Sequence, residues 1–244
     1  MKLLVLGAGY ATRLYPLTLD RPKPLLPVGG RPMVDRLLDC LEPIGFDAVY
    51  VVTNAKFAEQ FRDWAAGTGV VVVDDGTTSE EDRLGAIGDI GLVIEREEID
   101  DDLIVVAGDN LFSERLGDFG RIVRERAVPL LAIHDVGDVE LIRGRYNSVE
   151  IDADGRVTYF EEKPAEPRST LSGIGLYFYP RKTLPLIREY LAAGHNPDQP
   201  GRLVEWLYPR VDVYTWPVPG RWYDIGSREQ LDEADRIFSE RASD

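Results

Sequence analysis

The start of the chain constrains the fold more than any other stretch. Residues 3–6 are all apolar, and this run ends abruptly in the turn 7–9, Gly-Ala-Gly. Such a pattern is typical of a buried parallel strand that enters a loop. Glycine lets a backbone approach a ligand closely, and exposed N–H groups in such a turn form an anion-binding concavity. Arg13 and Lys23 add two cations, and no acidic residue lies between Gly7 and Leu19. The stretch therefore predicts a polyphosphate site.

Two other phosphate-binding loops do not match this stretch. A dinucleotide-binding loop requires G-x-G-x-x-G opening into a helix, but Thr12 stands at the third glycine position. The prolines between residues 16 and 27 also disfavour a helix directly after the turn. The Gly-Lys-Ser/Thr sequence of a Walker loop is absent. From the glycines alone, an ordinary strand-to-loop turn with surface charges explains the stretch equally well.

The composition excludes several classes of function. The 244 residues are 44% hydrophobic and 29% charged, which suits a globular protein of one large or two small domains. A net charge of -15 argues against nucleic acid or an anionic membrane as partner. No apolar run approaches the length of a membrane span, and the N-terminal segment lacks the flanks of a signal peptide. The single cysteine, Cys40, excludes an intramolecular disulfide and is compatible with a cytoplasmic location.

Apolar runs alternate with helical patterns along the first half of the chain. One amphipathic pattern covers residues 33–41, with Pro32 expected in the first turn of its helix, and others separate the later apolar runs. The runs that predict buried strands are 3–6, 48–53, 70–73, 103–107 and 129–136. This alternation predicts a Rossmann-like three-layer α/β/α fold with a mostly parallel central sheet and right-handed crossovers.

The second half of the chain has a different character. Residues 148–151 and 157–161 flank the turn Asp-Ala-Asp-Gly, which predicts a small β-hairpin. A further strand is expected over 173–179 and a closing helix over 227–239, where Ser227 and Gln230 fit a capping box. Because no linker or repeat interrupts the chain, we expect a single domain over residues 1–244, with halves at 1–136 and 137–244.

A second candidate ligand site follows the apolar run 103–107, which ends in Gly-Asp-Asn. Ligands of open α/β sheets bind outside the carboxyl ends of the strands. An aspartate at this end, Asp109, would therefore face the same cleft as the first loop. A turn or helix N-cap aspartate is the alternative interpretation.

The order of these residues resembles the signature of the sugar-1-phosphate nucleotidyltransferases. The first part is Gly-x-Gly-x-x-x-Arg-Leu at 7–14, followed by Pro-Leu-Thr and then Pro-Lys-Pro-Leu-Leu-Pro-Val at 22–28. Glu-Lys-Pro at 162–164 and Trp-x-Asp-x-Gly at 222–226 are similar to later elements of the same family. The resemblance covers nearly the whole chain. Two departures are Ala8 and Asn147, which stand where relatives often carry glycine, the second near the sugar.

The resemblance implies a Mg²⁺-dependent transfer of a nucleoside monophosphate from a nucleoside triphosphate to a sugar-1-phosphate, with release of pyrophosphate. It makes 1–136 the nucleotide-binding half and 137–244 the acceptor-binding half. The implied catalytic residues are Arg13, Lys23 and Lys163, and the implied metal ligands are Asp109 and Asp224. The implied nucleotide-binding residues are Leu6, Gly7, Ala8, Gly9, Thr12, Arg13, Lys23, Gly76, Thr77, Gly85 and Asp109. The implied acceptor-binding residues are Asn147, Glu162, Lys163 and Gly173.

These residue types suit the reaction. The attacking phosphate oxygen is already an anion, so the transfer needs charge neutralisation and alignment rather than a general base. The absence of a Ser/His/Asp or Cys/His pattern is consistent with this. A surface loop followed by an ordinary helix explains residues 74–97 equally well, which leaves Gly76, Thr77 and Gly85 open as base contacts.

Three alternative functions remain open from the sequence. The acceptor could be a non-sugar phosphate, since relatives transfer cytidylyl groups to phosphocholine or inositol phosphate. The chain could also be a non-catalytic nucleotide-sensing module. A dinucleotide-dependent oxidoreductase fits least, because the third glycine and its helix are missing. The expected partners are a nucleoside triphosphate and a phosphorylated small molecule, and relatives are often oligomers.

Overall fold

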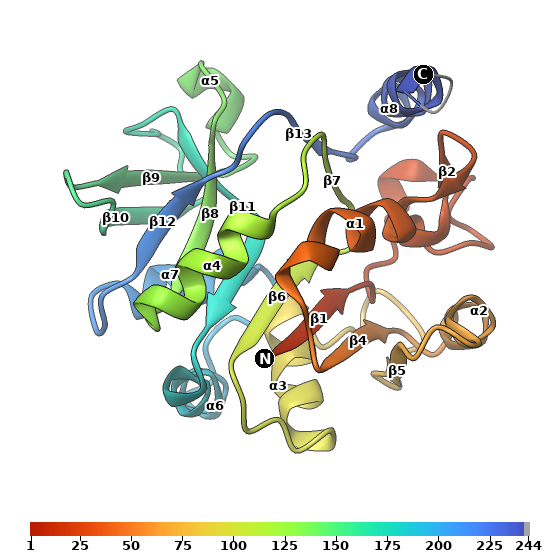
Figure 1. The fold of residues 1–244 in the computed structure, drawn as a ribbon, viewed down its shortest axis with the longest axis horizontal. Helices are drawn as coiled ribbons and strands as arrows, with labels where there is room; N and C mark the ends of the chain where they lie inside the picture. Colours follow the sequence, from red (N-terminus) through yellow and green to blue (C-terminus); the bar gives the residue numbers. More distant parts are fainter. Residues whose placement is uncertain (242–244) are drawn as a thin grey trace. The chain divides into compact units, whose positions relative to one another are not determined.

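A computed structural model describes residues 1–241 of the chain (Figure 1). Its strands are β1 (Lys2–Leu6), β2 (Pro27–Val28), β3 (Arg31–Pro32), β4 (Ala48–Thr53), β5 (Val71–Asp74), β6 (Leu103–Ala107), β7 (Asn110–Phe112), β8 (Leu130–Asp135), β9 (Asn147–Ile151), β10 (Val157–Glu162), β11 (Leu171–Tyr179), β12 (Tyr214–Pro217) and β13 (Trp222–Asp224). Its α-helices are α1 (Met33–Leu41), α2 (Ala58–Ala65), α3 (Ala86–Arg96), α4 (Gly117–Arg126), α5 (Val139–Ile142), α6 (Leu184–Ala192), α7 (Pro200–Leu207) and α8 (Arg228–Arg241).

The central sheet confirms the predicted α/β class. Seven strands are hydrogen-bonded in the order β12-β8-β11-β6-β1-β4-β5. The pairs β4–β5 and β12–β8 are parallel, whereas β11 runs antiparallel to β8. Most of the apolar runs predicted as buried strands are buried on both faces, but Val71 in the run 70–73 is 39% exposed, because β5 is an edge strand of the sheet. Leu3, Leu4 and Val5 of β1 are at most 1% exposed, as expected for strands of a sheet that helices cover. Small antiparallel hairpins accompany this sheet.

Two compact units can be distinguished, and each is described by itself. The first, here called the loop unit, contains residues 3–83, 106–120 and the chain from Pro219 onward. The second, here called the hairpin unit, contains residues 1–2, 84–105 and 121–218. These units divide the chain differently from the predicted halves 1–136 and 137–244: residues 84–105 and 121–136 belong to the hairpin unit, and the segment from Pro219 belongs to the loop unit. The division into a nucleotide-binding and an acceptor-binding half stays a prediction.

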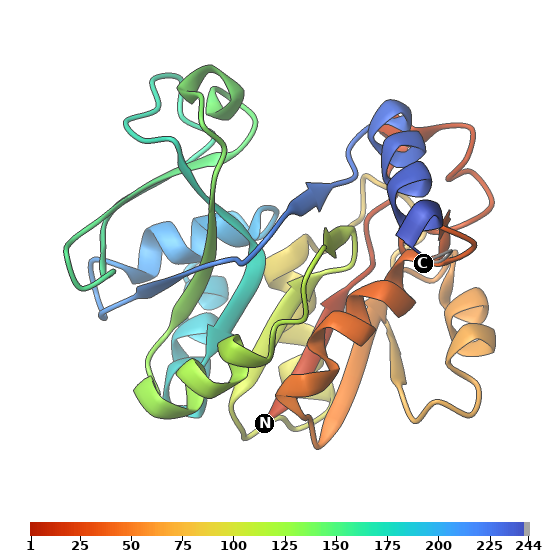
Figure 2. The same cartoon turned by 45° about the horizontal axis from the view of Figure 1, so that its top comes forward.

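The C-terminal segment joins the loop unit through one strand and one helix. Strand β13 pairs antiparallel with β7, and α8 lies beside β2 (Figures 1 and 2). Helix α8 buries Leu231, Ala234 and Phe238 in a cluster that also contains Leu14 and Met33. Burial of this apolar stripe explains why the closing helix forms where the sequence predicts it.

The hairpin unit takes its name from β9 and β10. These strands pair antiparallel, with Val157 opposite Ile151 and Glu162 opposite Asn147. The predicted turn is present, since the Gly155 N–H donates to Asp152 O at 3.0 Å and Gly155 adopts a φ of 79°. The predicted hairpin is therefore confirmed.

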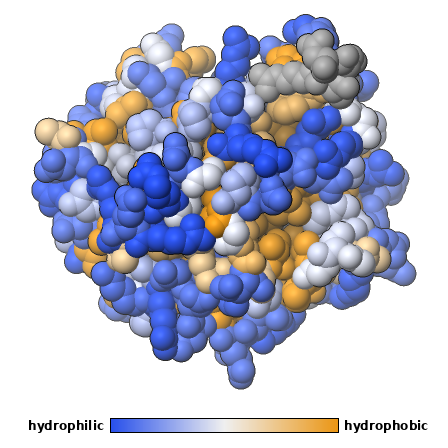
Figure 3. All heavy atoms as spheres, viewed as in Figure 1, coloured by the Kyte–Doolittle hydropathy of each residue, from blue (hydrophilic) through white to orange (hydrophobic). Residues whose placement is uncertain are grey.

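The surface agrees with the charged composition. The face drawn in Figure 3 is mostly hydrophilic, with scattered hydrophobic patches. Among residues 1–241, no helix has both the length and the hydropathy that crossing a membrane requires.

Candidate functional site

The glycine turn after β1 is shaped by close packing on one side and open space on the other. The Gly7 N–H donates to Val52 O at 2.9 Å. A Cβ on Gly7 would lie 3.1 Å from that oxygen and 3.2 Å from Phe61 Cζ, whereas a Cβ on Gly9 would have no neighbour within 4 Å. Gly7 is therefore needed for packing, and Gly9 leaves room beside the backbone, as a ligand-binding turn requires.

Two buried side chains hold this turn in place, and the sequence analysis missed both. Asn54 is fully buried, donates from Nδ2 to Ala8 O at 2.8 Å and accepts from the Phe57 N–H at 3.2 Å. Thr18 is 1% exposed and donates from Oγ1 to Ala11 O at 2.8 Å. One signal for Asn54 was available, because it directly follows the predicted strand 48–53, at the end of the sheet where ligands of α/β folds bind.

Lys23 and Asp109 come together although 86 residues separate them in the chain. Lys23 Nζ lies 2.7 Å from Asp109 Oδ2 in a charge-assisted hydrogen bond. Lys23 is 9% exposed, whereas the Asp109 side chain is 35% exposed. Arg13 is exposed on the same unit. The loop unit thus gathers both predicted triphosphate cations and the first predicted metal ligand.

Asp224 reaches the same region of the loop unit through strand pairing. In the β13–β7 register, Asp224 lies opposite Asn110, the residue that follows Asp109. The Trp222 Nε1–H donates to Asn110 Oδ1 at 3.1 Å, and this side-chain hydrogen bond further stabilises the pairing of β13 with β7. No group of three or more His, Cys, Asp or Glu side chains that could hold a metal occurs within residues 1–241. Two carboxylates nevertheless suit Mg²⁺, which usually keeps phosphates and waters as its other ligands.

The predicted base contacts fall in different units. In the loop unit, Thr77 is 5% exposed and donates from N and Oγ1 to Asp75 Oδ1 at 2.7 and 2.8 Å. The Tyr10 hydroxyl lies 3.5 Å from Thr77 Oγ1 and connects the glycine turn to residues 75–77. Gly85 belongs to the hairpin unit, where a Cβ would lie 2.6 Å from Pro197 O. The structure therefore brings Gly76 and Thr77 beside the glycine turn and gives Gly85 a packing contact.

The hairpin unit brings together three predicted acceptor residues. Asn147 and Glu162 are opposite each other in the β9–β10 register. Asn147 Oδ1 accepts from the Gly173 N–H at 2.6 Å, and Asn147 Nδ2 donates to Gly173 O at 3.0 Å. Lys163 is exposed and adopts a φ of 51°, a left-handed conformation that costs free energy for any residue except glycine.

Glu162 lies in a partly buried cluster of charged groups. Burial raises the pKa of the Glu162 carboxyl, and the nearby Glu205 carboxylate raises it further. The positive charges of Lys163 and Arg202 lower this pKa, as does the Asn147 amide. Burial also raises the pKa of Glu205, whose carboxylate lies 3.6 Å from the Arg202 guanidinium.

Helix α7 completes the surroundings of Glu162. A Cβ on Gly201 would overlap Glu162 Oε2, so any larger residue at this position would displace the carboxylate. The sequence analysis did not identify the α7 residues around Glu162, because nothing in the local sequence indicates that α7 packs against β10.

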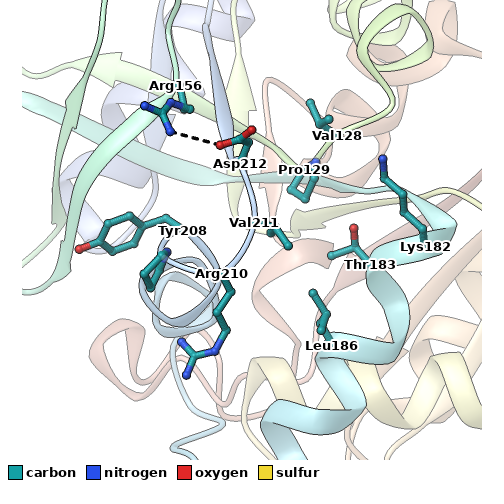
Figure 4. Close-up of a pocket in the computed structure, with 11 residues that line it drawn as sticks. Val128, Pro129, Arg156, Lys182, Thr183, Leu186, Tyr208, Arg210, Val211 and Asp212 are labelled. Atoms are coloured by element: carbon teal, nitrogen blue, oxygen red, sulfur yellow. Dashed lines mark hydrogen bonds and ion pairs between the residues drawn. The ribbon is translucent and has the colours of Figure 1, made fainter.

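A separate pocket of about 600 Å³ in the hairpin unit contains none of the predicted site residues (Figure 4). Arg156 and Asp212 form an ion pair of 3.2 Å at its rim, and Lys182 lines another side. The Arg210 side chain points away from the other lining residues and stacks over Trp206, with Cζ 4.0 Å from the ring centroid.

Comparison with known proteins shows the family. Residues 2–240 match the model of the family described as Nucleotidyl transferase. The chain is 30% identical over 93% of its length to a UTP–glucose-1-phosphate uridylyltransferase of Synechocystis, and spans 60% of that relative. It is 31% identical over its full length to a UTP–glucose-1-phosphate uridylyltransferase of Haloferax volcanii, and spans 98% of that protein.

The solved structures agree in fold. The chain superposes on a UDP-glucose pyrophosphorylase crystallised with UDP-glucose with a TM-score of 0.81, 19% identity and 98% coverage of both chains. The curated relatives differ in length, and the chain spans only 55 to 60% of the first two. Since the family match nonetheless extends over almost the whole chain, this protein belongs to the nucleotidyl transferase family.

Proposed function

We propose that this chain transfers a nucleoside monophosphate from a nucleoside triphosphate to a sugar-1-phosphate and releases pyrophosphate. The observation that carries the proposal is the Lys23–Asp109 pair of 2.7 Å, with Asp224 opposite the next residue in the same unit. A cation and two carboxylates beside a glycine turn suit a triphosphate with its divalent metal. The relatives named as uridylyltransferases support the same class of reaction.

The loop unit binds the triphosphate in this proposal. Backbone N–H groups of residues 7–9, the Arg13 guanidinium and the Lys23 ammonium neutralise the phosphates. Tyr10 and Thr77 place residues 75–77 beside the glycine turn, where they contact the nucleobase. The side chains of Asn54 and Thr18 keep the turn rigid, so that its donors are oriented before the substrate arrives.

Asp109 and Asp224 would hold Mg²⁺. Their oxygens are the hard ligands that this ion prefers, and the Asp109 carboxylate remains partly exposed although one oxygen accepts from Lys23. When bound, the ion supplies charge neutralisation at the phosphates. Lys23 orients the Asp109 carboxylate and carries a positive charge next to it.

The hairpin unit supplies the acceptor contacts. Glu162 accepts hydrogen bonds from sugar hydroxyls, and Lys163 neutralises the acceptor phosphate. An oxygen of that phosphate forms a bond to the α-phosphorus of the triphosphate, the bond between the α-phosphorus and the bridging oxygen breaks, and pyrophosphate leaves with the electron pair. In this proposal the two units act as one nucleotidyltransferase domain over residues 1–244.

The remaining expectations stay predictions. A single cysteine is compatible with a cytoplasmic location. Homo-oligomerisation is expected from the family alone. A non-sugar phosphate acceptor, such as phosphocholine or inositol phosphate, uses the same chemistry and is an outcome of the test below.

The test is pyrophosphate release across a grid of nucleoside triphosphates and phosphorylated acceptors, with and without Mg²⁺. We expect release only when one triphosphate and one acceptor are both present. Asp109→Asn and Asp224→Asn should abolish release, whereas Asp212→Asn, an exposed aspartate at the separate pocket, should not. Nucleotide binding by the folded protein without release for any pair would instead indicate a nucleotide-sensing module.

A further inference from the structure

Gly201 is the second residue of α7, where that helix packs against β10 (Figure 1). Glycine is unfavourable within a helix relative to alanine, so helix stability does not account for it. The space around it does, because a Cβ on Gly201 would overlap Glu162 Oε2 and would lie 3.0 Å from Glu162 Cδ and 3.2 Å from Phe160 Cζ. The backbone of α7 therefore forms a wall directly against the Glu162 carboxylate.

The side chains around Glu162 differ in how easily they can move. Phe160 is 2% exposed and lies two residues earlier on the same face of β10, and a ring in a close-packed interior shifts little. Asn147, opposite Glu162 in the strand register, is 6% exposed and makes hydrogen bonds of 2.6 and 3.0 Å with the Gly173 backbone. Glu162 is only half-buried. If position 201 gained a side chain, the Glu162 carboxylate is thus the group that would move.

The direction of that movement follows from the same contacts. The wall of α7 lies on one side of the carboxylate, and the buried side chains of Phe160 and Asn147 lie beside it. The carboxylate would leave the amino end of α7, whose partial positive charge stabilises an anion. It would move toward the partly exposed side, from which an acceptor has to approach.

We propose that Gly201 is a positioning residue that fixes the Glu162 carboxylate for the acceptor, without touching the acceptor itself. The inference rests on the proposed function for the role of Glu162, whereas the contact between Gly201 and Glu162 is geometric. The absence of a side chain at position 201 lets the carboxylate lie back against α7 and leaves room in front of it. Acceptors that donate a hydroxyl to Glu162 are therefore selected only while position 201 is glycine.

A small displacement of the carboxylate has a large effect on such an acceptor. Hydrogen bonds between a hydroxyl and an oxygen acceptor hold over about 2.5–3.0 Å, and a misplacement of about 1 Å can cost about a hundredfold in rate. The residues proposed to bind the triphosphate belong to the loop unit, whereas Gly201 and Glu162 belong to the hairpin unit. The effect should therefore be confined to the acceptor.

The test compares variants of the full chain. Gly201→Ala adds the Cβ that overlaps Glu162. Gly91→Ala is the matched control, because Gly91 is also a buried helical glycine of the hairpin unit, and its Cβ would overlap the end of the Leu191 side chain instead. Gly201→Ala combined with Glu162→Asp shortens the acid by one methylene and keeps its carboxylate clear of the new Cβ.

We expect Gly201→Ala to raise KM for the acceptor by about ten- to a hundredfold and to leave KM for the triphosphate unchanged. Gly91→Ala should change neither. In the Glu162→Asp background, Gly201→Ala should have no further effect, because the two residues act through one contact. An unchanged KM for the acceptor, equal increases for both substrates, or an equally large increase in the Glu162→Asp background would overturn the proposal.

A second readout does not require activity. A crystal structure of Gly201→Ala should show the Glu162 carboxylate displaced away from α7, with Phe160 and the α7 backbone in their wild-type positions. A displaced α7 beside an unmoved Glu162 would overturn the proposal. If Gly201→Ala does not fold, the combination with Glu162→Asp should restore folding, and its failure to do so would also overturn the proposal.

The two readouts separate this inference from the proposed function. If the wild-type chain releases no pyrophosphate with any pair of substrates, the proposed function fails. The crystal structure of Gly201→Ala then still decides whether Gly201 controls the position of Glu162.

Discussion

Lys163 offers a test in which stability and activity should change in opposite directions. The residue adopts a φ of 51° and precedes Pro164, which restricts its backbone further. The left-handed conformation costs about 1–2 kcal/mol for a residue with a Cβ. Glycine removes that cost but loses about 0.5–1 kcal/mol through its greater freedom in the unfolded chain. Lys163→Gly should therefore stabilise the protein by about 0.5–1 kcal/mol.

For a chain of this length, that gain corresponds to a rise in Tm of roughly 1–4 °C. The same substitution deletes the cation proposed to neutralise the acceptor phosphate. Loss of a charge-assisted contact costs about 1.5–3 kcal/mol, so kcat/KM for the acceptor should fall about ten- to a hundredfold. The assays are thermal unfolding and pyrophosphate release at varied acceptor concentration.

Two further variants separate the backbone from the charge. Lys163→Ala deletes the cation but keeps the Cβ, so it should lose the same activity with a Tm within about 1–2 °C of wild type, as expected for an exposed side chain. Lys182→Ala removes another exposed lysine, at the separate pocket in Figure 4, and should change neither quantity. Full activity of Lys163→Gly, or a lower Tm for it than for Lys163→Ala, would refute the reasoning.

Three other substitutions test separate parts of the account. Because Glu162 has a raised pKa, folding favours its neutral form, and its ionised form costs stability above that pKa. Glu162→Gln should thus raise Tm at pH 7–8, and this gain should vanish as the pH falls through the raised pKa of Glu162. The same substitution should impair use of the acceptor. A lower Tm at neutral pH would contradict the direction of the pKa shift. Ala11→Gly should raise the free energy of unfolding by about 0.5–1 kcal/mol in denaturant titrations, since Ala11 has a φ of 49°, and no change would show that the turn relaxes. Asn54→Ala should lower the free energy of unfolding by about 1–3 kcal/mol, because it removes the Asn54 donor to Ala8 O and one of the two acceptors of the Phe57 N–H in the interior, and should raise KM for the triphosphate. An unchanged KM would separate this residue from the glycine turn.

The strands were predictable because their signal is local. Runs such as 103–107 are apolar on both faces, and strands covered by helices on both sides require that pattern. The prediction failed at residues 27–32, where the proline at 32 was expected in the first turn of a helix. There, Pro27 and Val28 pair with Pro32 and Arg31 through a turn at Gly29 and Gly30, and α1 begins at Met33. Two adjacent glycines with positive φ override the helical signal of the proline.

The candidate site was predictable in residue types but not in connections. Asp109 was predicted as a ligand because it follows the end of a strand, yet its pairing with Lys23 spans 86 residues and depends on tertiary packing. The paired hydrogen bonds between the Asn147 amide and the Gly173 backbone join residues 26 positions apart, and no local pattern indicates them. The C-terminal segment likewise joins the loop unit through the β13–β7 pairing, which no sequence pattern within either segment specifies.

The most direct test of the central claim follows the phosphorus atoms themselves. Phosphorus-31 NMR of the wild-type chain with Mg²⁺, the preferred nucleoside triphosphate and its sugar-1-phosphate should show a nucleoside diphosphate sugar and pyrophosphate appearing in equal amounts. Omission of the acceptor should leave the triphosphate intact. Pyrophosphate formed without the acceptor, or a triphosphate that persists with every acceptor tried, would contradict the account.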